Sequence, residues 1–351
     1  MLNIYTNFYL EVWKTMEKIF TDLVVIGDSN IDILAYCDSY PVEGGSGFGK
    51  LEGTSVGGTA VNTAICASRL GLKVAIVTGL GKDEPGYKIF EILEKENIIT
   101  QYIKRTDQPT GNVFTIVNKT SGERTFIALR EQCADWQLRR EDLSRELIHS
   151  TRAIFISGVG VTENKKIKPS LELISAAIEY AEERKIPIFF DPNLRIPDKS
   201  LPQEVITVLK DIISHSTYYL PNEIEHNIIF KEKVFEKMPV TIIKRGDKGV
   251  VGIVDDKKYE IPAFKVKVVD TSGAGDSFNA GFIAAFLHPE CFDFAGKDIP
   301  AVNNDREYEI FKALIAGSAV AGYVVSKRGT LEAFPFSIED LKRFLENQKE
   351  G

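Results

Sequence analysis

The sequence is poor in the residues and patterns that mark several large classes of protein. Its 351 residues include only four cysteines and four histidines, all scattered and with no CxxC pair, so we expect neither disulfides nor a zinc site. Basic residues are not in excess, because 43 Lys and Arg stand against 50 Asp and Glu, which gives a net charge of −7. This balance argues against a nucleic-acid partner and limits anion binding to local sites.

Long apolar runs are scarce as well. We find no stretch that we expect to span a membrane, and therefore predict no membrane partner. Residues 1–20 are interrupted by Glu11 and lack a small-residue cleavage site, which is not the pattern of a signal peptide. Because Met16 precedes a segment that looks like a natural start, we interpret residues 1–20 as an N-terminal extension or a start-site artefact. Together these features predict a reduced, cytoplasmic chain.

What the sequence does contain is a regular alternation of apolar runs and helix-like segments. Apolar runs that read as buried strands occupy residues 21–28, 73–81, 152–160, 186–193, 216–222 and 239–246. Segments with helical spacing occupy residues 61–71, 85–98, 170–185, 274–287 and 308–327. Strands that are apolar throughout predict a mostly parallel sheet covered on both faces, an α/β fold, in one domain over residues 21–351.

Two segments break this rhythm. Residues 31–56 and 111–129 alternate polar and apolar residues and contain turn signals, which predicts a small lid of β-strands beside the main sheet. Within the first segment, GGSGFGKL (44–51) nearly matches the phosphate-loop pattern GxxxxGK[ST]. Leu51 replaces the hydroxyl residue that would hold magnesium, and no helix is predicted to follow, so we interpret this stretch as a loop of the lid. No GxGxxG follows the first strand, so the dinucleotide-binding pattern is missing too.

The stretch DTSGAGDSF (270–278) carries the strongest chemical signal. Gly273, Ala274 and Gly275 have little or no side chain, so their backbone N–H groups can approach a ligand closely. If a helix begins here, these amides lie at its positive end and form a site for the charge on a phosphoryl group. Asp276 in the first turn would then be placed to accept a proton from an attacking hydroxyl. The same nine residues also fit an ordinary helix start with an acidic first turn.

Polar residues end several of the predicted core strands. They occur in GDSNID (27–32), GGTAVNTA (57–64), FFDPN (189–193), YLPNEIE (219–225) and IIKRGDKG (242–249). Ligands of open α/β sheets bind outside the carboxyl ends of the strands. These strand ends are therefore expected to converge on one cleft with the start of the helix at 274.

From about Asp22 to the last helix, these motifs resemble the ribokinase, or PfkB, family of carbohydrate kinases. The DTxGAGD signature matches from Asp270 to Asp276, and the GG…N and N-x-x-E patterns stand in the family order. The resemblance implies a three-layer sandwich with a sheet of nine strands or a similar number, a β lid, and transfer of the ATP γ-phosphate to a sugar hydroxyl. It implies Asp276 as general base and the backbone amides of residues 273–276 as anion hole.

The resemblance also implies roles for other residues. The expected sugar contacts are Asn30, Asp32, Gly57, Gly58 and Asn62. The expected ATP contacts are Asn222, Glu225, Lys244, Gly246, Gly249 and Thr271. Glu225 would also act indirectly on Mg²⁺, and a monovalent cation such as K⁺ would bind near Asp270 and Gly329.

Two features bear on the substrate and nucleotide. The segment between Glu225 and Thr241 is short for the family, and Lys244 and Arg245 replace the usual aliphatic residues, so the adenine side is expected to differ. The stretches RxxCADxxL and DPNLR look like those of 2-keto-3-deoxygluconate kinases, and more loosely like those of fructokinases. Since arginine forks match carboxylates, Arg130 and Arg195 are predicted to bind a sugar acid, with fructose as the second choice.

Other interpretations stay open at this point. A ribokinase, a nucleoside kinase, a non-catalytic nucleotide- or sugar-binding regulator and a purely structural α/β protein share parts of the pattern. Asn30 and Asp32 also fit turn residues, and Glu225 fits a solvated helix face. Asp191 fits a strand cap, Arg130 a solvated lid residue and Arg195 a structural ion pair. We also expect a homodimer formed through the lid.

Overall fold

A computed structural model describes residues 20–121, 124–158, 160–161, 167–168, 171–194, 201–230, 238–296 and 304–347. The predicted N-terminal extension, except for Phe20, and Arg195 therefore lie outside the described residues.

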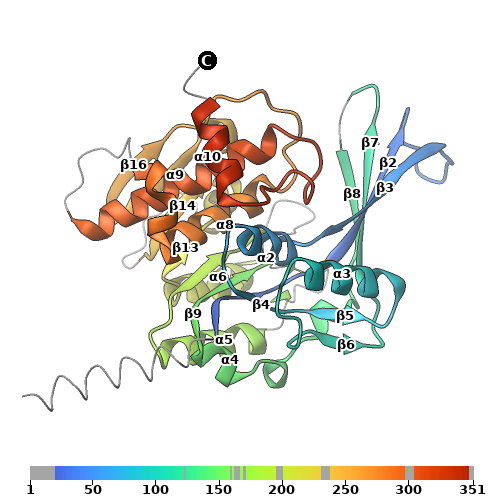
Figure 1. Ribbon diagram of the computed structural model, residues 1–351. Helices are drawn as coiled ribbons and strands as arrows, with labels where there is room; N and C mark the ends of the chain where they lie inside the picture. Colours follow the sequence, from blue (N-terminus) through green and yellow to red (C-terminus); the bar gives the residue numbers. More distant parts are fainter. Residues whose placement is uncertain are drawn as a thin grey trace, which may run out of the picture.

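The described residues form a central sheet of eight strands in the order β16-β15-β14-β13-β12-β9-β1-β4 (Figure 1). The six strands from β14 to β4 run parallel, and β15 and β16 add an antiparallel hairpin. The bounds are β1 (Thr21–Ile26), β4 (Val74–Val77), β9 (Thr151–Ser157), β12 (Ile188–Asp191), β13 (Tyr218–Tyr219), β14 (Val240–Lys244), β15 (Val250–Val254) and β16 (Lys257–Ile261). The mostly parallel α/β architecture predicted from the apolar strands is confirmed.

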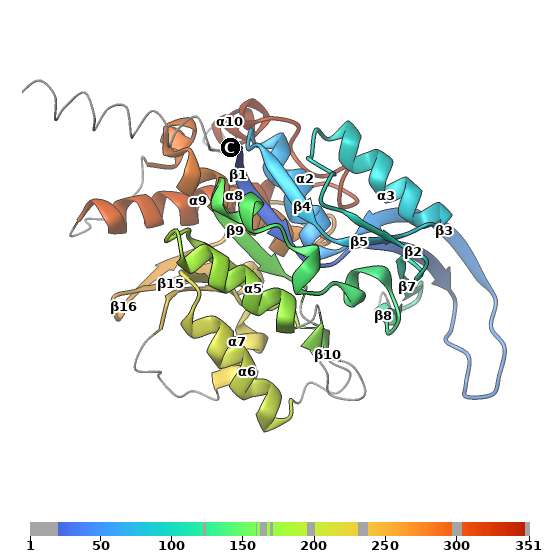
Figure 2. The same ribbon diagram turned by 90° about the horizontal axis from the view of Figure 1, so that it is seen from below.

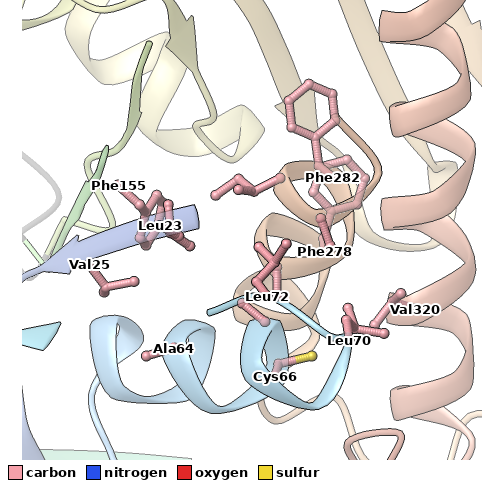
Figure 3. Packing of buried hydrophobic residues seen from close by; sticks show 14 of the residues in the cluster. Leu23, Val25, Ala64, Cys66, Leu70, Leu72, Phe155, Phe278, Phe282 and Val320 are labelled. Carbon is pink, nitrogen blue, oxygen red and sulfur yellow. The ribbon is translucent and has the colours of Figure 1, made fainter. Parts of the chain in front are cut away.

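Helices cover both faces of this sheet, as Figure 2 shows from below. One layer contains α2 (Thr59–Arg69), α8 (Ala274–Leu287), α9 (Asp305–Val325) and α10 (Ile338–Asn347), and the other contains α4 (Arg145–His149), α5 (Leu171–Glu182), α6 (Gln203–Ser214) and α7 (Glu223–Phe230). Alternate side chains of β1 enter opposite cores. Leu23 and Val25 belong to the same core cluster as Phe278 and Phe282 (Figure 3), whereas Val24 and Ile26 belong to the core beneath α5 and α6.

Helix α9 departs from the expectation that no segment could span a membrane. It has 21 residues and is apolar enough to cross one by length and composition. However, 72% of its most apolar 18-residue stretch is buried inside the protein, where α9 packs against α8. The composition of α9 is that of a core helix.

The lid predicted from alternating residues is present as a separate four-stranded sheet in the order β3-β2-β7-β8. Its strands are β2 (Asn30–Cys37), β3 (Gly49–Gly57), β7 (Gly111–Asn118) and β8 (Arg124–Leu129), and they project from one side of the molecule (Figure 1). Gly44 lies in the loop before β3, and Lys50 lies within β3. The stretch that resembles a phosphate loop therefore opens no helix.

The remaining elements are short or peripheral. They are α3 (Glu84–Lys95), β5 (Gly79–Gly81), β6 (Lys104–Thr106), β10 (Gly160–Val161), β11 (Ile167–Lys168), η1 (Ala134–Gln137), η2 (Arg140–Asp142), η3 (Gly246–Lys248) and η4 (Pro289–Gly296). The single strand predicted at 73–81 is in fact β4 and β5, which belong to different sheets. In the polar segment that follows α8, η4 buries Phe292 fully, so this part of the segment contributes to the core.

Candidate active site

Helix α8 begins where the glycine-rich stretch predicted it. Gly273 is the N-cap residue with a left-handed φ of 71°, and a Cβ there would lie 2.7 Å from Thr330 Cγ2, so this position requires glycine. The Ala274 N–H donates to the Thr271 carbonyl (3.3 Å). Among the described residues, no acceptor is found for the N–H of Gly275. The positive end of α8 thus presents the Gly275 amide to the site.

Asp276 lies in the first turn of α8 and contacts α2. The Asn62 side chain donates through Nδ2 to Asp276 Oδ2 (2.7 Å), and Thr63 Oγ1 lies 3.4 Å from the Asp276 carbonyl. Asn62 is buried, and its Oδ1 atom has no hydrogen-bond partner within the described part of the chain. Asn62 therefore fixes one carboxylate oxygen of Asp276 and keeps an acceptor for a ligand.

A cavity of about 930 Å³ lies between the inner face of the lid and the starts of α2 and α8. Asn30, Asp32, Gly58 and Asn62 line it, as predicted for the sugar side. Asn30 Nδ2 donates to Asp32 Oδ1 (2.8 Å), and β2 pairs Asn30 with Gly57 of β3. A Cβ at Gly57 would overlap the Asp32 carboxylate, so this glycine makes room for a site side chain. Gly57 does not itself line the cavity.

Arg130 also lines this cavity, but it is buried rather than a solvated lid residue. Its guanidinium bonds to Asn30 Oδ1 (3.0 Å), to Asp28 Oδ2 (3.4 Å) and, through a very short contact, to Asp135. Its Nε atom has no hydrogen-bond partner among the described residues. The described residues thus accept three of the five N–H donors of the fork that was expected to be open for a substrate carboxylate, and Nε is among those left.

The charges around Arg130 do not cancel. Two buried carboxylates, Asp28 and Asp135, face one guanidinium. Burial raises the pKa of Asp135 to about 6 despite the nearby Arg130 charge. Buried acidic side chains therefore outnumber the one cation behind the part of the cavity wall that Arg130 forms.

A second cavity, of about 880 Å³, lies on the other side of the start of α8. We call it the nucleotide-side cavity and the first one the sugar-side cavity, after the contacts predicted for each. Its lining includes the apolar side chains of Val250, Phe264, Val266, Val268, Ala321 and Val325. All six predicted ATP contacts line this second cavity as well, namely Asn222, Glu225, Lys244, Gly246, Gly249 and Thr271. Gly273 and Asp276 line both cavities, so the two meet where α8 begins.

The N-x-x-E motif forms a reciprocal pair at the start of α7. Asn222 Oδ1 accepts from the Glu225 N–H (2.9 Å), and Glu225 Oε2 accepts from the Asn222 N–H (2.8 Å), the geometry of a capping box. Glu225 Oε1 accepts from the Leu194 N–H (2.8 Å). Glu225 is buried, so its alternative as a solvated helix residue is wrong. Burial and the neighbouring Asp191 charge raise the pKa of Glu225 to about 7.

Lys244 and Arg245, at the end of β14, point in different directions. The Lys244 ammonium donates to Asp191 Oδ2 (2.6 Å) and to Asn279 Oδ1 (3.1 Å) inside the nucleotide-side cavity. Arg245 instead pairs with Glu260 (3.2 Å) and does not line either cavity. Gly249 has a φ of 85° and packs against the Ile261 carbonyl, so it shapes the turn after β14.

Comparison with known proteins decides the family. The model of the pfkB family of carbohydrate kinases matches residues 21–336. The chain belongs to this family. A PfkB-family chain of this kind is an ATP-dependent sugar kinase, which is the activity that the resemblance predicted.

Curated relatives of this PfkB chain are named for different substrates. It is 27% identical to probable fructokinase-3 of Arabidopsis thaliana over 338 residues, which cover 93% of this chain and 92% of the relative. It is 28% identical to 5-dehydro-2-deoxygluconokinase 2 of Bacillus cereus over 349 residues, covering 94% and 96%. A candidate ribokinase II from Escherichia coli, solved with ATP and Mg²⁺, has the same fold, with a TM-score of 0.73 at 20% identity over 93% of this chain and 100% of that one.

The donor set of this PfkB chain fits Mg²⁺ bound mainly by a nucleotide. Asp191 and Glu225 supply carboxylates in the nucleotide-side cavity. In the part of the chain that the structure describes, no three acidic, histidine or cysteine residues cluster as a metal site. Mg²⁺ usually takes one or two carboxylates and fills the rest of its shell with phosphate oxygens and water, which suits this arrangement.

The Asp270 loop is tied to the Gly329 loop. Asp270 Oδ1 accepts from the Ser272 N–H (3.0 Å), and Oδ2 accepts from the Gly329 N–H (3.2 Å). The two loops that the family resemblance associates with K⁺ thus lie together, and K⁺ binding there stays a prediction.

Sequence reasoning missed several side chains of the site. Asp191 and Asn193 were expected at the cleft only as part of the FFDPN strand end, without contacts of their own, and Asn279 was not considered. Asn193 has a φ of 35° and bonds to Thr59 Oγ1 at the start of α2, which ties the end of β12 to the sugar side. Asn279 stands three positions after Asp276 on α8, and this helical spacing was the one signal that could have found it.

Proposed function

We propose that Asp276 is the general base of this kinase and that the start of α8 holds the phosphoryl group in transfer. The observation that carries the proposal is that Asp276 lines both cavities, one beneath the lid and one beside the KRGDKG turn. A hydroxyl bound on one side and a phosphoryl donor on the other would meet at this carboxylate.

The chemistry follows from these positions. The substrate hydroxyl gives its proton to the Asp276 carboxylate while its oxygen bonds to the γ-phosphorus, and the bond from that phosphorus to the bridging oxygen of ADP breaks. Asn62 holds Asp276 Oδ2, and the other carboxylate oxygen, Oδ1, would face the hydroxyl. The Gly275 amide donates to an oxygen of the phosphoryl group, where negative charge is spread in the transition state.

ATP and Mg²⁺ would occupy the nucleotide-side cavity. Its apolar side chains suit an adenine ring, and Asn222, Glu225 and Lys244 line the same cavity. Bound Mg²⁺ would neutralise charge on the phosphate oxygens, and Glu225 would reach it indirectly, through water. Gly246 and Gly249 shape the turn after β14, and both line this cavity.

For the substrate we favour a keto sugar acid of the 2-keto-3-deoxygluconate kind. The unused Arg130 Nε and the resemblance of the RxxCADxxL and DPNLR stretches support it, as does the likeness to a 5-dehydro-2-deoxygluconokinase. Because Asp28 and Asp135 already engage Arg130, binding of a carboxylate would depend on a second cation. Arg195 is the residue that we propose for this role.

Fructose is the second candidate. The excess of buried carboxylates near Arg130 favours a neutral sugar, and the fructokinase relative points the same way. Nothing in the described cavity supports a nucleobase in preference to either sugar.

The test is an assay of ATP consumption with sugar acids, neutral sugars and nucleosides, with phosphorylated products identified by mass spectrometry. We expect kcat/KM to be highest for the keto sugar acid and to fall in Arg195→Ala for the acid but not for fructose. Highest activity with fructose and no effect of Arg195→Ala would replace the acid by a neutral sugar. If activity were highest with a nucleoside, or if no tested compound gave a phosphorylated product, the proposed substrate class would be refuted.

A further inference from the structure

The side chain of Lys244 enters the site from the last residue of β14. Its backbone is fixed because the Lys244 N–H donates to the Pro221 carbonyl (2.9 Å). Its ammonium donates to Asp191 Oδ2 and Asn279 Oδ1, and Asn279 Nδ2 donates to the same Asp191 oxygen (2.6 Å). Three side chains from β14, β12 and α8 thus form a closed triangle.

This triangle is buried where it is anchored and open toward the cavity. Asp191 and Asn279 are 2% and 0% exposed, whereas 14% of the Lys244 side chain is exposed. An ammonium has three N–H donors, and the described residues accept two of them. Lys244 lines the nucleotide-side cavity, and its Nζ lies 3.9 Å from the position that a Cβ on Gly275 would take. The remaining donor is therefore beside the Gly275 amide.

We propose that Lys244 donates this third N–H to an oxygen of the transferred phosphoryl group, and that Asp191 and Asn279 are positioning residues that hold the ammonium there. The proposal rests on the proposed function and adds a specific role for three side chains. Charge on the phosphoryl oxygens is what the site must stabilise, and a preorganised cation does so without reorganising during the reaction. A free lysine side chain has many rotamers, which the carboxylate and the amide reduce to one.

The contact with the phosphoryl group is tested by binding, independently of turnover. ADP and β,γ-methylene ATP, each with Mg²⁺, are titrated into the wild-type chain and Lys244→Met by calorimetry. Loss of one charged hydrogen bond corresponds to about a 10- to 100-fold change in Kd. We expect that loss for the ATP analogue and less than a threefold change for ADP, with partial recovery in Lys244→Arg. An equal loss of affinity for ADP and for the ATP analogue, or no loss for either, would refute the proposed contact between Lys244 and the phosphoryl group.

A matched control separates this effect from the removal of any lysine. Lys258 lies on β16 of the same sheet, is well exposed and pairs with Glu260 at the surface. Lys258→Met should leave both affinities unchanged. A comparable loss in Lys258→Met would show that the effect is general and would refute a local role of Lys244.

The positioning role is tested by a double-mutant cycle in kcat. Asp191→Asn removes the charge but keeps an acceptor for the Asn193 N–H, which in the wild type donates to Asp191 Oδ1 (3.0 Å). We expect Asp191→Asn to lower kcat about tenfold when Lys244 is present and less than twofold in the Lys244→Met chain, because partners in one network are not additive. If Asp191→Asn lowered kcat by the same factor in the wild-type and Lys244→Met chains, Asp191 would not act through Lys244.

Asn279→Ala gives the same cycle if Asp191→Asn does not fold, as judged by thermal unfolding. The proposed function and this inference fail in different ways. A wild-type chain that phosphorylates no sugar refutes the function, whereas an active chain with an unaltered ADP-to-analogue affinity ratio in Lys244→Met refutes only the role of Lys244.

Discussion

Asn62 and Asp276 stand 214 positions apart, yet Asn62 Nδ2 lies 2.7 Å from Asp276 Oδ2. The contact joins α2, which follows the lid strand β3, to α8, which follows the nucleotide-side strands. Asn62 donates with one end of its amide, and its Oδ1 has no partner in the described part of the chain. A substrate that hydrogen-bonds to Asn62 Oδ1 would therefore be held beside Asp276, the proposed base that abstracts its proton.

Gly275 offers a test in which stability and activity move in opposite directions. A Cβ at Gly275 would meet only Lys244 Nζ, at 3.9 Å, so Gly275→Ala fits the fold and should stabilise α8 by about 0.5–1 kcal/mol. The same methyl group would intrude on the phosphoryl group, so we expect kcat/KM to fall at least about tenfold. Thermal unfolding and the kinase assay measure the two effects.

Gly273→Ala is the matched comparison. Its φ of 71° and its contacts with Thr330 and Phe334 predict a loss of both stability and activity. If Gly275→Ala were fully active, the amide of residue 275 would not be aimed at the phosphate.

The sequence predicted the backbone of this site better than its side-chain contacts. Glycine entry followed by an apolar run predicted a helix at 274–287, which is the observed α8, because both signals are local. The Lys244 triangle could not be predicted, since Asp191 and Asn279 lie 53 and 35 positions from Lys244 and meet it only through the sheet order. Lys244 was predicted as an ATP contact, but its partners Asp191 and Asn279 were not.

Arg130 shows the same limit. Its sequence neighbours suggested a lid arginine open to a substrate carboxylate. Its partner Asp28 is 102 positions away and could not be found from a local pattern, whereas Asp135 is five positions away, inside the RxxCADxxL stretch, and was overlooked. The N-x-x-E motif was recognised, but its second role as the cap of α7 follows only from geometry.

Arg130→Ala should be strongly destabilising. It leaves the buried Asp28 and Asp135 carboxylates without their cation, a loss that typically costs about 3–5 kcal/mol. We expect chemical denaturation to report a loss in this range. A loss below about 1 kcal/mol would show that the guanidinium does not stabilise these carboxylates and is free for a ligand.

Glu225 should make stability fall as pH rises toward neutrality. Its pKa of about 7 in the folded chain exceeds the ordinary glutamate value of 4.5, so the folded state binds more protons than the unfolded state between these values. The free energy of unfolding should therefore decrease from about pH 5 to about pH 7.5. In Glu225→Gln this part of the decrease should be missing.

The quantity to compare is the slope of the unfolding free energy against pH. The absolute free energy is not suitable, because Glu225→Gln also disturbs the cap of α7. Asp135, whose pKa is raised to about 6, contributes equally to both chains and cancels in the comparison. Identical slopes in the two chains would contradict the assignment of a raised pKa to Glu225.

The lid is the surface that we propose for a homodimer. Its edge strands β3 and β8 expose the apolar side chains of Leu51, Ile127 and Leu129, which do not line the sugar-side cavity. Light scattering should give about twice the chain mass of 39.2 kDa for the wild type and the chain mass for Ile127→Lys. A monomeric wild-type chain at micromolar concentration would rule out this use of the lid.

The central claim is that Asp276 takes the proton from the sugar hydroxyl, and the turnover of Asp276→Asn tests it most directly. An asparagine keeps the shape of the side chain and an acceptor for Asn62 Nδ2 but is too weak a base to accept the proton. With the best sugar and saturating ATP and Mg²⁺, we predict a fall in kcat of about 10²- to 10⁴-fold, with the thermal midpoint and the Kd for ADP nearly unchanged. A correctly folded Asp276→Asn chain with kcat within about threefold of the wild type would contradict the account.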